Sequence, residues 1–250
     1  MKKIESRGLH EGVIEEIGRR IVTGELPPER ALPSEAELCE TLAVSRTALR
    51  EALRVLAATG LLEAKRKIGT IVRPVSDWNN LDAAVLSWRL QSQDADRVIG
   101  ELYELRHLIE PIAASLAAQH ANASDLRAMR SAYRDMESAG DDGERIKEPD
   151  MRFHRAIIEA SGNRLFSSLA HVIGAALGVS FDLVSKAPRG QKHSMPAHRQ
   201  VLEAIASHDP PAARLAMQKL IEDSQHDAHA VRRTRSARTS RKVGHHPKSA

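Results

Sequence analysis

The six residues Ser45-Arg46-Thr47-Ala48-Leu49-Arg50 decide the fold of the N-terminal part of this chain. A serine ahead of helix-forming residues predicts a capped helix start at Ser45, and Gly60 predicts the C-terminal stop of that helix. A shorter helix opens at Ser34, because Ser34-Glu35-Ala36-Glu37 has the spacing of a capping box, and it ends near Leu42. Since only Ala43-Val44 separates the two helices, the stretch predicts a helix-turn-helix.

The segments on either side complete a winged version of this motif. Apolar residues recur on one face between Leu9 and Thr23, which predicts an amphipathic helix ahead of the pair. After Gly60, the pattern changes to two short strand-like stretches, Leu61-Leu62-Glu63-Ala64 and Thr70-Ile71-Val72-Arg73. The basic turn Lys65-Arg66-Lys67-Ile68-Gly69 joins them, so we expect a β-hairpin, which is the wing.

Beyond a predicted linker at Pro74 to Asp82, the pattern is helical throughout. Helices are expected at about Leu81 to Leu90, Ala95 to His120, Ser124 to Ala139, Ile146 to Ser161, Arg164 to Lys186, Pro196 to His208 and Pro211 to Ala230. Pro111 should kink the second of these. Short connections between amphipathic helices indicate an antiparallel bundle. The fold class is therefore mainly α, with an N-terminal winged helix-turn-helix and a C-terminal all-α antiparallel helical bundle.

Length and charge divide the chain in the same way. Its 250 residues suit two domains, and with 42% hydrophobic but 3% aromatic residues the core must be mostly aliphatic. Residues 1–75 hold 13 basic against 11 acidic side chains, residues 76–230 hold 17 against 22, and residues 231–250 hold 7 against none. We expect a polyanion-binding domain at 8–75, a linker and connecting helix at 76–95, an all-helical domain at 96–230 to which the family resemblance described below assigns effector binding and dimerisation, and a basic disordered tail at 231–250.

The compartment follows from what the sequence lacks. The single cysteine, Cys39, cannot form an internal disulfide, and no apolar run resembles a signal peptide or a membrane span. A cytoplasmic protein without a membrane partner is the expectation.

The helix that begins at Ser45 carries the predicted DNA-binding face. At about 100° per residue, Arg46, Thr47, Arg50 and Arg54 lie opposite the apolar side. Arg46 and Thr47 occupy the first turn, the part of a recognition helix that enters the major groove, and arginine there can contact guanine bidentately. Phosphate contacts are expected from Ser45 and the hairpin tip. The full predicted DNA-binding set is Ser34, Glu35, Ser45, Arg46, Thr47, Arg50, Arg54, Lys65, Arg66, Lys67, Gly69 and Thr70. The alternative is a merely solvated charged face.

Three stretches resemble the DNA-binding domain of the GntR family: Leu32 to Leu38 (Leu-Pro-Ser-Glu-Ala-Glu-Leu), Ser45 to Leu53 (Ser-Arg-Thr-Ala-Leu-Arg-Glu-Ala-Leu) and Leu56 to Leu62 (Leu-Ala-Ala-Thr-Gly-Leu-Leu). The helical remainder resembles the FadR subfamily with its FCD-type effector domain, so the resemblance covers about residues 8 to 228. Ala36 stands where many members have an arginine. The stretches Trp78-Asn79-Asn80-Leu81-Asp82 and Val85-Leu86-Ser87-Trp88 look most like repressors of sugar-acid catabolism, of the galactonate-operon kind.

A candidate metal site lies in the helical part. Asp150 and His154 are four residues apart and project from one helix face, a spacing that suits metal ligation. The resemblance implies a third ligand, His198, and a fourth histidine at the place of Leu220. The expected cofactor is a divalent Zn, Mn or Ni ion. Because Leu220 replaces the fourth histidine, we expect the site to bind this ion weakly or not at all. The alternative is a surface ion pair between Asp150 and His154, with His198 as a capping or core residue.

Two further residues are expected to bind an effector. The resemblance places Arg106 inside the bundle, where its guanidinium would hold a carboxylate, and Asn163 is expected to line the same cavity. A salt bridge from Arg106 to Glu110, four residues on, is an equally weighted alternative. A metal plus an arginine would suit a sugar acid or another hydroxy acid.

These residues predict a sequence-specific transcriptional regulator, a repressor that binds an inverted-repeat operator as a homodimer and leaves it when a small carboxylate effector binds. Two other classes compete with this prediction. Two histidines and a carboxylate also describe non-haem iron enzymes, although those usually occupy β-barrels. An architectural DNA-binding protein without an effector is the third hypothesis.

Overall fold

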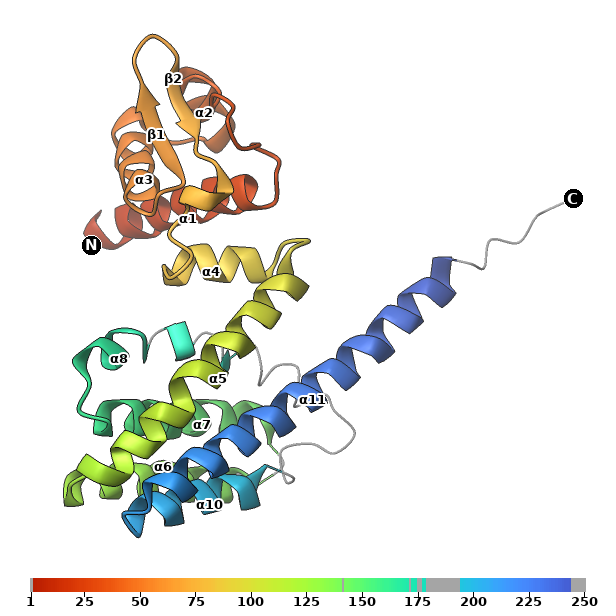
Figure 1. The fold of residues 1–250 in the computed structure, drawn as a ribbon. Coiled ribbons are helices and arrows are strands. Elements are labelled where there is room, and N and C mark those ends of the chain that lie inside the picture. The colour runs from red at the N-terminus through yellow and green to blue at the C-terminus, as the bar shows by residue number, and fades with distance from the viewer. Residues whose placement is uncertain (1, 141, 171, 175–176, 179–193, 244–250) are drawn as a thin grey trace, which may run out of the picture. The chain divides into compact units, whose positions relative to one another are not determined.

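The computed structural model describes residues 2–140, 142–170, 172–174, 177–178 and 194–243 (Figure 1). The chain divides into two compact units, Met1–Val98 and Ile99–Ala250, and the division falls within one long helix. The first unit contains the two strands, and the described part of the second is helical. The fold class predicted from the sequence is confirmed.

The first unit is a three-helix arrangement with a hairpin and a fourth, short helix. Its elements are α1 (Lys2–Val22), α2 (Glu35–Leu42), α3 (Arg46–Ala58), β1 (Leu62–Lys65), β2 (Gly69–Val72), a 3-10 turn η1 (Val75–Asp77) and α4 (Ala83–Leu90). The strands pair antiparallel from Leu62 opposite Val72 to Lys65 opposite Gly69. The wing is therefore present at the predicted place.

Local capping explains where α2 and α3 begin. The Ser34 hydroxyl accepts a hydrogen bond from the Glu37 amide at 3.3 Å, while the Glu37 carboxylate accepts one from the Ser34 amide at 2.7 Å. The Ser45 hydroxyl accepts from the Ala48 amide at 3.2 Å and so caps α3. Between the helices, Ala43 adopts a left-handed φ of 52°. These caps satisfy amides that have no partner within the helix, so both predicted helix starts are confirmed.

The connecting helix α4 belongs to the first unit, which differs from the separate segment expected at 76–95. Trp78, Val85 and Trp88 are buried in the same apolar cluster as Ile17 of α1 and Leu49 of α3. Gly18 makes room for the Trp88 ring, because a Cβ at Gly18 would lie 2.3 Å from a ring carbon. The tryptophan thereby fastens α4 to α1, a tertiary contact that sequence periodicity does not reveal.

The second unit is a helical bundle. Its named helices are α5 (Ala95–His120), α6 (Ala123–Ala139), α7 (Gly143–Ala160), α8 (Arg164–Ser168), α10 (Met195–Ala206) and α11 (Pro210–Val243). Helix α6 packs against α7, and α10 packs against both α11 and α6. Helix α5 continues through Pro111. Among the described residues, no helix is both long and apolar enough to cross a bilayer.

Two predicted boundaries in this unit differ from the structure. Helix α8 ends at Ser168, whereas one helix was expected from Arg164 to Lys186, part of which lies outside the described residues. Helix α11 runs to Val243, so the expected helix end at Ala230 was wrong, and residues 244–250 of the predicted tail lie outside the described residues. No proline or glycine occurs between Val231 and Val243, so nothing local ends the helix there.

Candidate functional site

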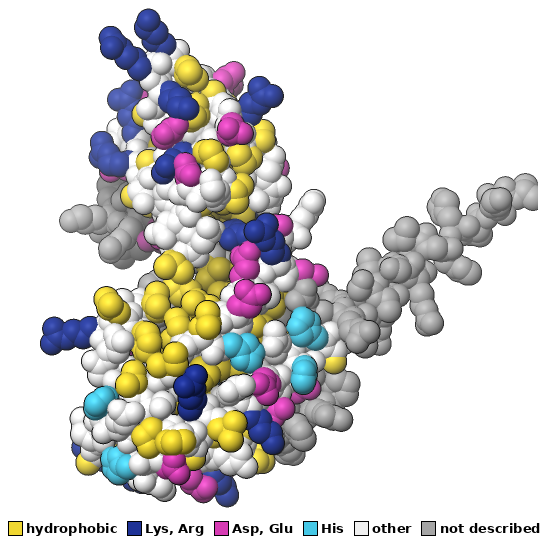
Figure 2. Space-filling view, in the orientation of Figure 1, with side chains coloured by type: hydrophobic (Ala, Val, Ile, Leu, Met, Phe, Trp, Pro, Cys, Tyr) yellow, Lys and Arg dark blue, Asp and Glu magenta, His cyan; other side chains and the backbone are white. Residues whose placement is uncertain are grey.

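The first turn of α3 presents the predicted base-reading residues to solvent. Arg46 and Thr47 are exposed, while Leu49 on the opposite face is fully buried. Lys and Arg side chains gather around the hairpin end of this unit in the space-filling view (Figure 2). The geometry suits insertion of the N-terminal end of α3 into a major groove.

Two of the other predicted DNA contacts are held by acidic neighbours. Arg50 Nε lies 3.0 Å from a Glu35 carboxylate oxygen, and Arg54 forms a 2.6 Å ion pair with Glu51. Both pairs are exposed, and exposed ion pairs are weak. A phosphate group could therefore replace the glutamate at either arginine, and Glu35, itself one of the predicted DNA contacts, pairs with Arg50 in this structure.

The wing tip is basic and tightly turned. Lys65, Arg66 and Lys67 are exposed, and Lys65 pairs with Glu63 at 3.0 Å. Gly69 has a φ of 101°, which side chains rarely adopt, and an added Cβ there would meet open space. The glycine is needed for the turn, and the partly buried Thr70 follows it in β2.

In the second unit, the three predicted metal ligands come together. Asp150, His154 and His198 each offer one ligand atom, and these atoms all lie within 4.8 Å of one another. Asp150 and His154 come from α7 and His198 from the start of α10, and all three are buried. The alternative of a surface ion pair between Asp150 and His154 is correct in its partners, which lie 4.0 Å apart, but wrong in its location, because both side chains are buried.

A second acidic residue, which the sequence singled out only as a partner of Arg106, orients one of these histidines. Glu110 of α5 accepts a hydrogen bond from Arg106 Nε at 2.6 Å through one oxygen. Its other oxygen lies 2.5 Å from His154 Nδ1. A carboxylate on Nδ1 fixes the ring and leaves Nε2 as the ligand atom, as in many metal sites. A long-range contact of this kind has no signal in the sequence beyond the acidic residue itself.

The Arg106–Glu110 salt bridge is present, and both side chains are almost completely buried. Burial alone would raise the pKa of the Glu110 carboxyl, but Arg106 and His154 lower it to about 2. Burial likewise raises the pKa of Asp150, and the neighbouring His198, His154 and Arg106 hold it below its ordinary value. Both acids are consequently carboxylates at neutral pH.

The surroundings of the two His198 ring nitrogens differ. Its Nδ1 lies 2.9 Å from the Ser194 carbonyl oxygen, to which it must donate, so a neutral ring presents a lone pair at Nε2. Nε2 lies 3.0 Å from Asp150 Oδ1 but without hydrogen-bond alignment, and it is buried with no hydrogen-bond partner among the described residues. A cation bound by both atoms would satisfy the imidazole lone pair and the carboxylate oxygen together. Asp150, His154 and His198 thus fit a divalent metal.

The remaining predicted residues have mainly structural environments. Leu220 is buried in α11, at the place where the resemblance implies a fourth histidine. Asn163 caps α8, and its side-chain oxygen accepts from the Leu165 and Phe166 amides at 3.0 and 3.4 Å. This oxygen is used in capping α8, so only the side-chain NH2 group of Asn163 takes no part in the cap.

Comparisons with known proteins agree with this division. The model of bacterial regulatory proteins of the gntR family matches residues 9–72, and that of the FCD domain matches residues 101–223. The chain is 36% identical over 212 residues to the galactonate operon transcriptional repressor of Escherichia coli, which covers 83% of this chain and 91% of the relative. The chain belongs to the GntR family. Its FCD domain makes it a FadR-type member.

A second relative supports the same assignment, and a solved structure supports the fold. The HTH-type transcriptional regulator LutR of Bacillus subtilis is 34% identical, over 79% of this chain and 90% of LutR. Listeria monocytogenes Lar, a solved structure 20% identical in sequence, shares the fold with a TM-score of 0.63 over 88% of this chain and 96% of its own. As a GntR member, the chain is a DNA-binding transcriptional regulator with an effector domain and not an enzyme. The two-histidine enzyme hypothesis is not supported.

Proposed function

We propose that this GntR regulator is a cytoplasmic repressor that binds an inverted-repeat operator as a homodimer and is released by a small hydroxy acid. The observation that carries the proposal is the buried Asp150–His154–His198 group, with its unpartnered His198 Nε2, in the FCD domain. The 36% identical relative is a repressor of a galactonate operon, which favours a sugar acid as the effector.

The residues of this site have two roles, holding the ion and orienting its ligands. Asp150, His154 and His198 would hold a divalent ion such as Zn, Mn or Ni, while Glu110 orients His154. A bound ion of this kind supplies positive charge and open coordination positions for the hydroxyl and carboxylate oxygens of a hydroxy acid. With Leu220 in place of a fourth histidine, three protein ligands leave those positions open.

Arg106 is the second group proposed to attract the acid. Its Nε is bound to Glu110, and the buried Arg106 side chain supplies positive charge beside the cluster. An acid arriving here changes the balance of charge around Glu110 and Asp150. Such a differential interaction is what an effector needs in order to favour one arrangement of the regulator over another.

On the DNA side, Arg46 and Thr47 are proposed to read base edges, and Ser34, Ser45 and the wing residues to contact phosphates. Arg50 and Arg54 exchange their exposed glutamate partners for phosphate when DNA binds. Two copies are required because each recognition helix covers one half-site of an inverted repeat. This dimer supplies the geometry that effector binding would disturb.

A mobility-shift assay on DNA from upstream of the protein's own gene tests the proposal. The assay is titrated with galactonate, gluconate, glucuronate and lactate, and release by one acid at a concentration at which the others have no effect is expected. His198→Ala should still bind the DNA but fail to release it, whereas the exposed His229→Ala should behave as the unmodified protein does. DNA binding that no acid alters would contradict effector control and favour the architectural hypothesis.

A further inference from the structure

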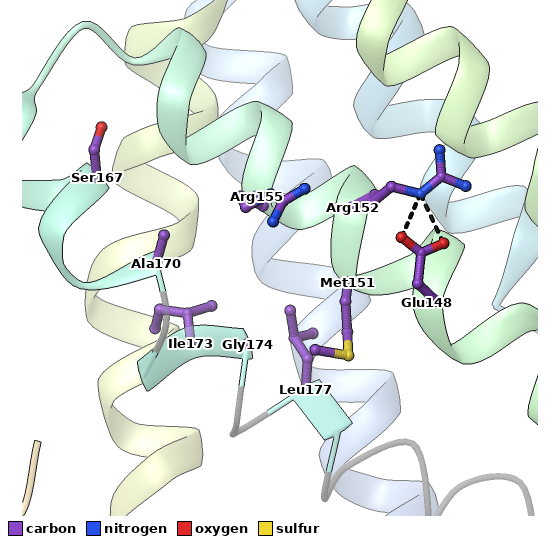
Figure 3. Close-up of a pocket in the computed structure, with 9 residues that line it drawn as sticks. All are labelled: Glu148, Met151, Arg152, Arg155, Ser167, Ala170, Ile173, Gly174 and Leu177. Carbon is purple, nitrogen blue, oxygen red and sulfur yellow. Dashed lines mark hydrogen bonds and ion pairs between the residues drawn. The ribbon is translucent and has the colours of Figure 1, made fainter. Parts of the chain in front are cut away.

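A second cavity lies on a different face of α7 from the metal group. It has a volume of roughly 480 Å³, and its wall on α7 is made by a stripe at helical spacing: Glu148, Met151, Arg152 and Arg155. The opposite wall comes from the segment that begins with α8 and consists of Ser167, Ala170, Ile173, Gly174 and Leu177 (Figure 3). None of the metal-group residues lines it, because Asp150 and His154 project from another side of the helix.

The floor of this cavity is apolar. Met151, Ala170, Ile173 and Leu177 belong to one cluster of packed hydrophobic side chains. Gly174 contributes no side chain, and a Cβ added there would lie 3.6 Å from the Met151 terminal methyl, an ordinary contact. A larger side chain at Gly174 would project toward the cavity. The space thus depends on a small residue at this position, and it suits an apolar ligand body.

The rim carries one arginine with donors to spare. Arg152 is occupied, because it contacts Glu148 at 2.8 Å and Asp135 at 2.9 Å. Arg155 has a more distant partner, Glu159, at 3.8 Å, which exceeds the length of a charge-assisted hydrogen bond. Its guanidinium can therefore pair with an acid group bidentately. Two arginines against Glu148 also leave the lining with a net positive charge.

We propose that this cavity is a second ligand site, distinct from the metal group, that binds a monocarboxylate with an apolar body. The carboxylate pairs with Arg155, and the body packs on Met151, Ile173 and Leu177. Sugar acids do not fit this chemistry, because an apolar floor would leave their hydroxyl groups without hydrogen-bond partners. The site is independent of the effector proposed for the metal group.

Calorimetric titration of the full chain with 4-phenylbutyrate tests the site, with 4-phenylbutanamide as the uncharged probe of the same shape. We expect one molecule of the acid to bind per chain and the amide to bind about tenfold more weakly, the effect of one charged hydrogen-bonded contact. Arg155→Gln should remove this difference between the two probes. Arg145→Gln, an exposed arginine on the same helix that does not line the cavity, should preserve it.

A second pair of variants locates the site. Gly174→Leu should abolish binding of both probes by filling the cavity, while Gly174→Ala should retain it. Binding that Asp150→Asn removes, or that neither Arg155→Gln nor Gly174→Leu changes, would overturn the proposal, as would the absence of any binding. Operator release by a sugar acid is measured on Arg155→Gln in parallel. Its retention separates a failure of this site from a failure of the proposed function.

Discussion

The Glu110 carboxylate contacts Arg106 through one oxygen and His154 through the other, so it links the buried arginine to the metal group. The residue therefore acts on the metal group from another helix. Its partners are themselves buried, so they have no water to replace a lost carboxylate. The stability of the bundle and the orientation of His154 should both depend on this one side chain.

Glu110→Gln should destabilise the chain by about 3–5 kcal/mol, because it breaks the buried ion pair between Glu110 and Arg106. Urea unfolding followed by circular dichroism measures the change. The matched control is Glu148→Gln, which removes an exposed partner of Arg152 and should cost less than about 1 kcal/mol. Equal effects of the two substitutions would show that the buried pair contributes no more than a surface pair.

The contribution of Glu110 to the free energy of unfolding should depend on pH. The pKa of Glu110 is lowered from 4.5 to about 2 on folding, mainly by Arg106 and His154 acting against the burial that raises it. Its stabilising contribution is therefore complete above about pH 4.5 and is lost as the pH falls toward 2. The difference in unfolding free energy between the unmodified chain and Glu110→Gln should be constant between pH 7 and 5 and shrink below that range. A difference that grows on acidification would contradict the assignment.

Among the secondary-structure elements, α2, α3 and the hairpin could be predicted because their signals are local. Ser34, Ser45 and Gly60 mark helix ends through contacts with residues three or four positions away. The packing of α4 into the first unit could not be predicted, because it depends on the contact of the Trp88 ring with Gly18, which is distant in sequence. The same holds for the contact of Glu110 with His154. The early end expected for α11 was wrong because basic composition was taken as disorder.

The contact between α1 and α4 gives a prediction at this level. Gly18→Ala should destabilise the first unit by about 1–3 kcal/mol, since its Cβ would overlap the Trp88 ring and force that ring to move. Tryptophan fluorescence during urea unfolding reports the change. Gly12→Ala on the same helix meets nothing within 4 Å and should stabilise the chain by about 0.5–1 kcal/mol. Similar values for the two substitutions would mean that α4 does not depend on this contact.

Substitutions in the recognition helix and in the wing should change DNA binding in different ways. Arg46→Ala should weaken binding to the operator by about 1–3 kcal/mol and relax its sequence preference, because the side chain reads base edges. Arg66→Ala should weaken binding to all DNA sequences equally and reduce the salt slope by about one, because it contacts phosphate. Fluorescence anisotropy with operator and scrambled DNA over a range of salt concentrations distinguishes them. If Arg46→Ala kept the sequence preference of the unmodified protein, another residue would have to read the bases.

For the whole molecule, the proposed mechanism connects the basic face of the recognition helix and the wing, in the N-terminal unit, to a buried metal-ligand group in the helical unit of the same chain. Sequence reasoning identified both ends of this connection: the exposed Arg46 and the Asp150–His154–His198 group. It could not identify how the ends communicate, since that depends on arrangements of whole domains rather than on residue patterns. Metal occupancy and DNA release are the two quantities that must change together if the connection exists.

The most direct test measures DNA release by the effective acid before and after metal removal. Labelled upstream DNA is followed by fluorescence anisotropy with protein treated with EDTA, and again after that protein is reloaded with Mn²⁺ or Zn²⁺. The account predicts that the acid releases DNA from the reloaded protein, while the EDTA-treated protein remains bound at the same acid concentration. Release that is equally efficient with and without the metal would contradict the claim that Asp150, His154 and His198 form the effector site.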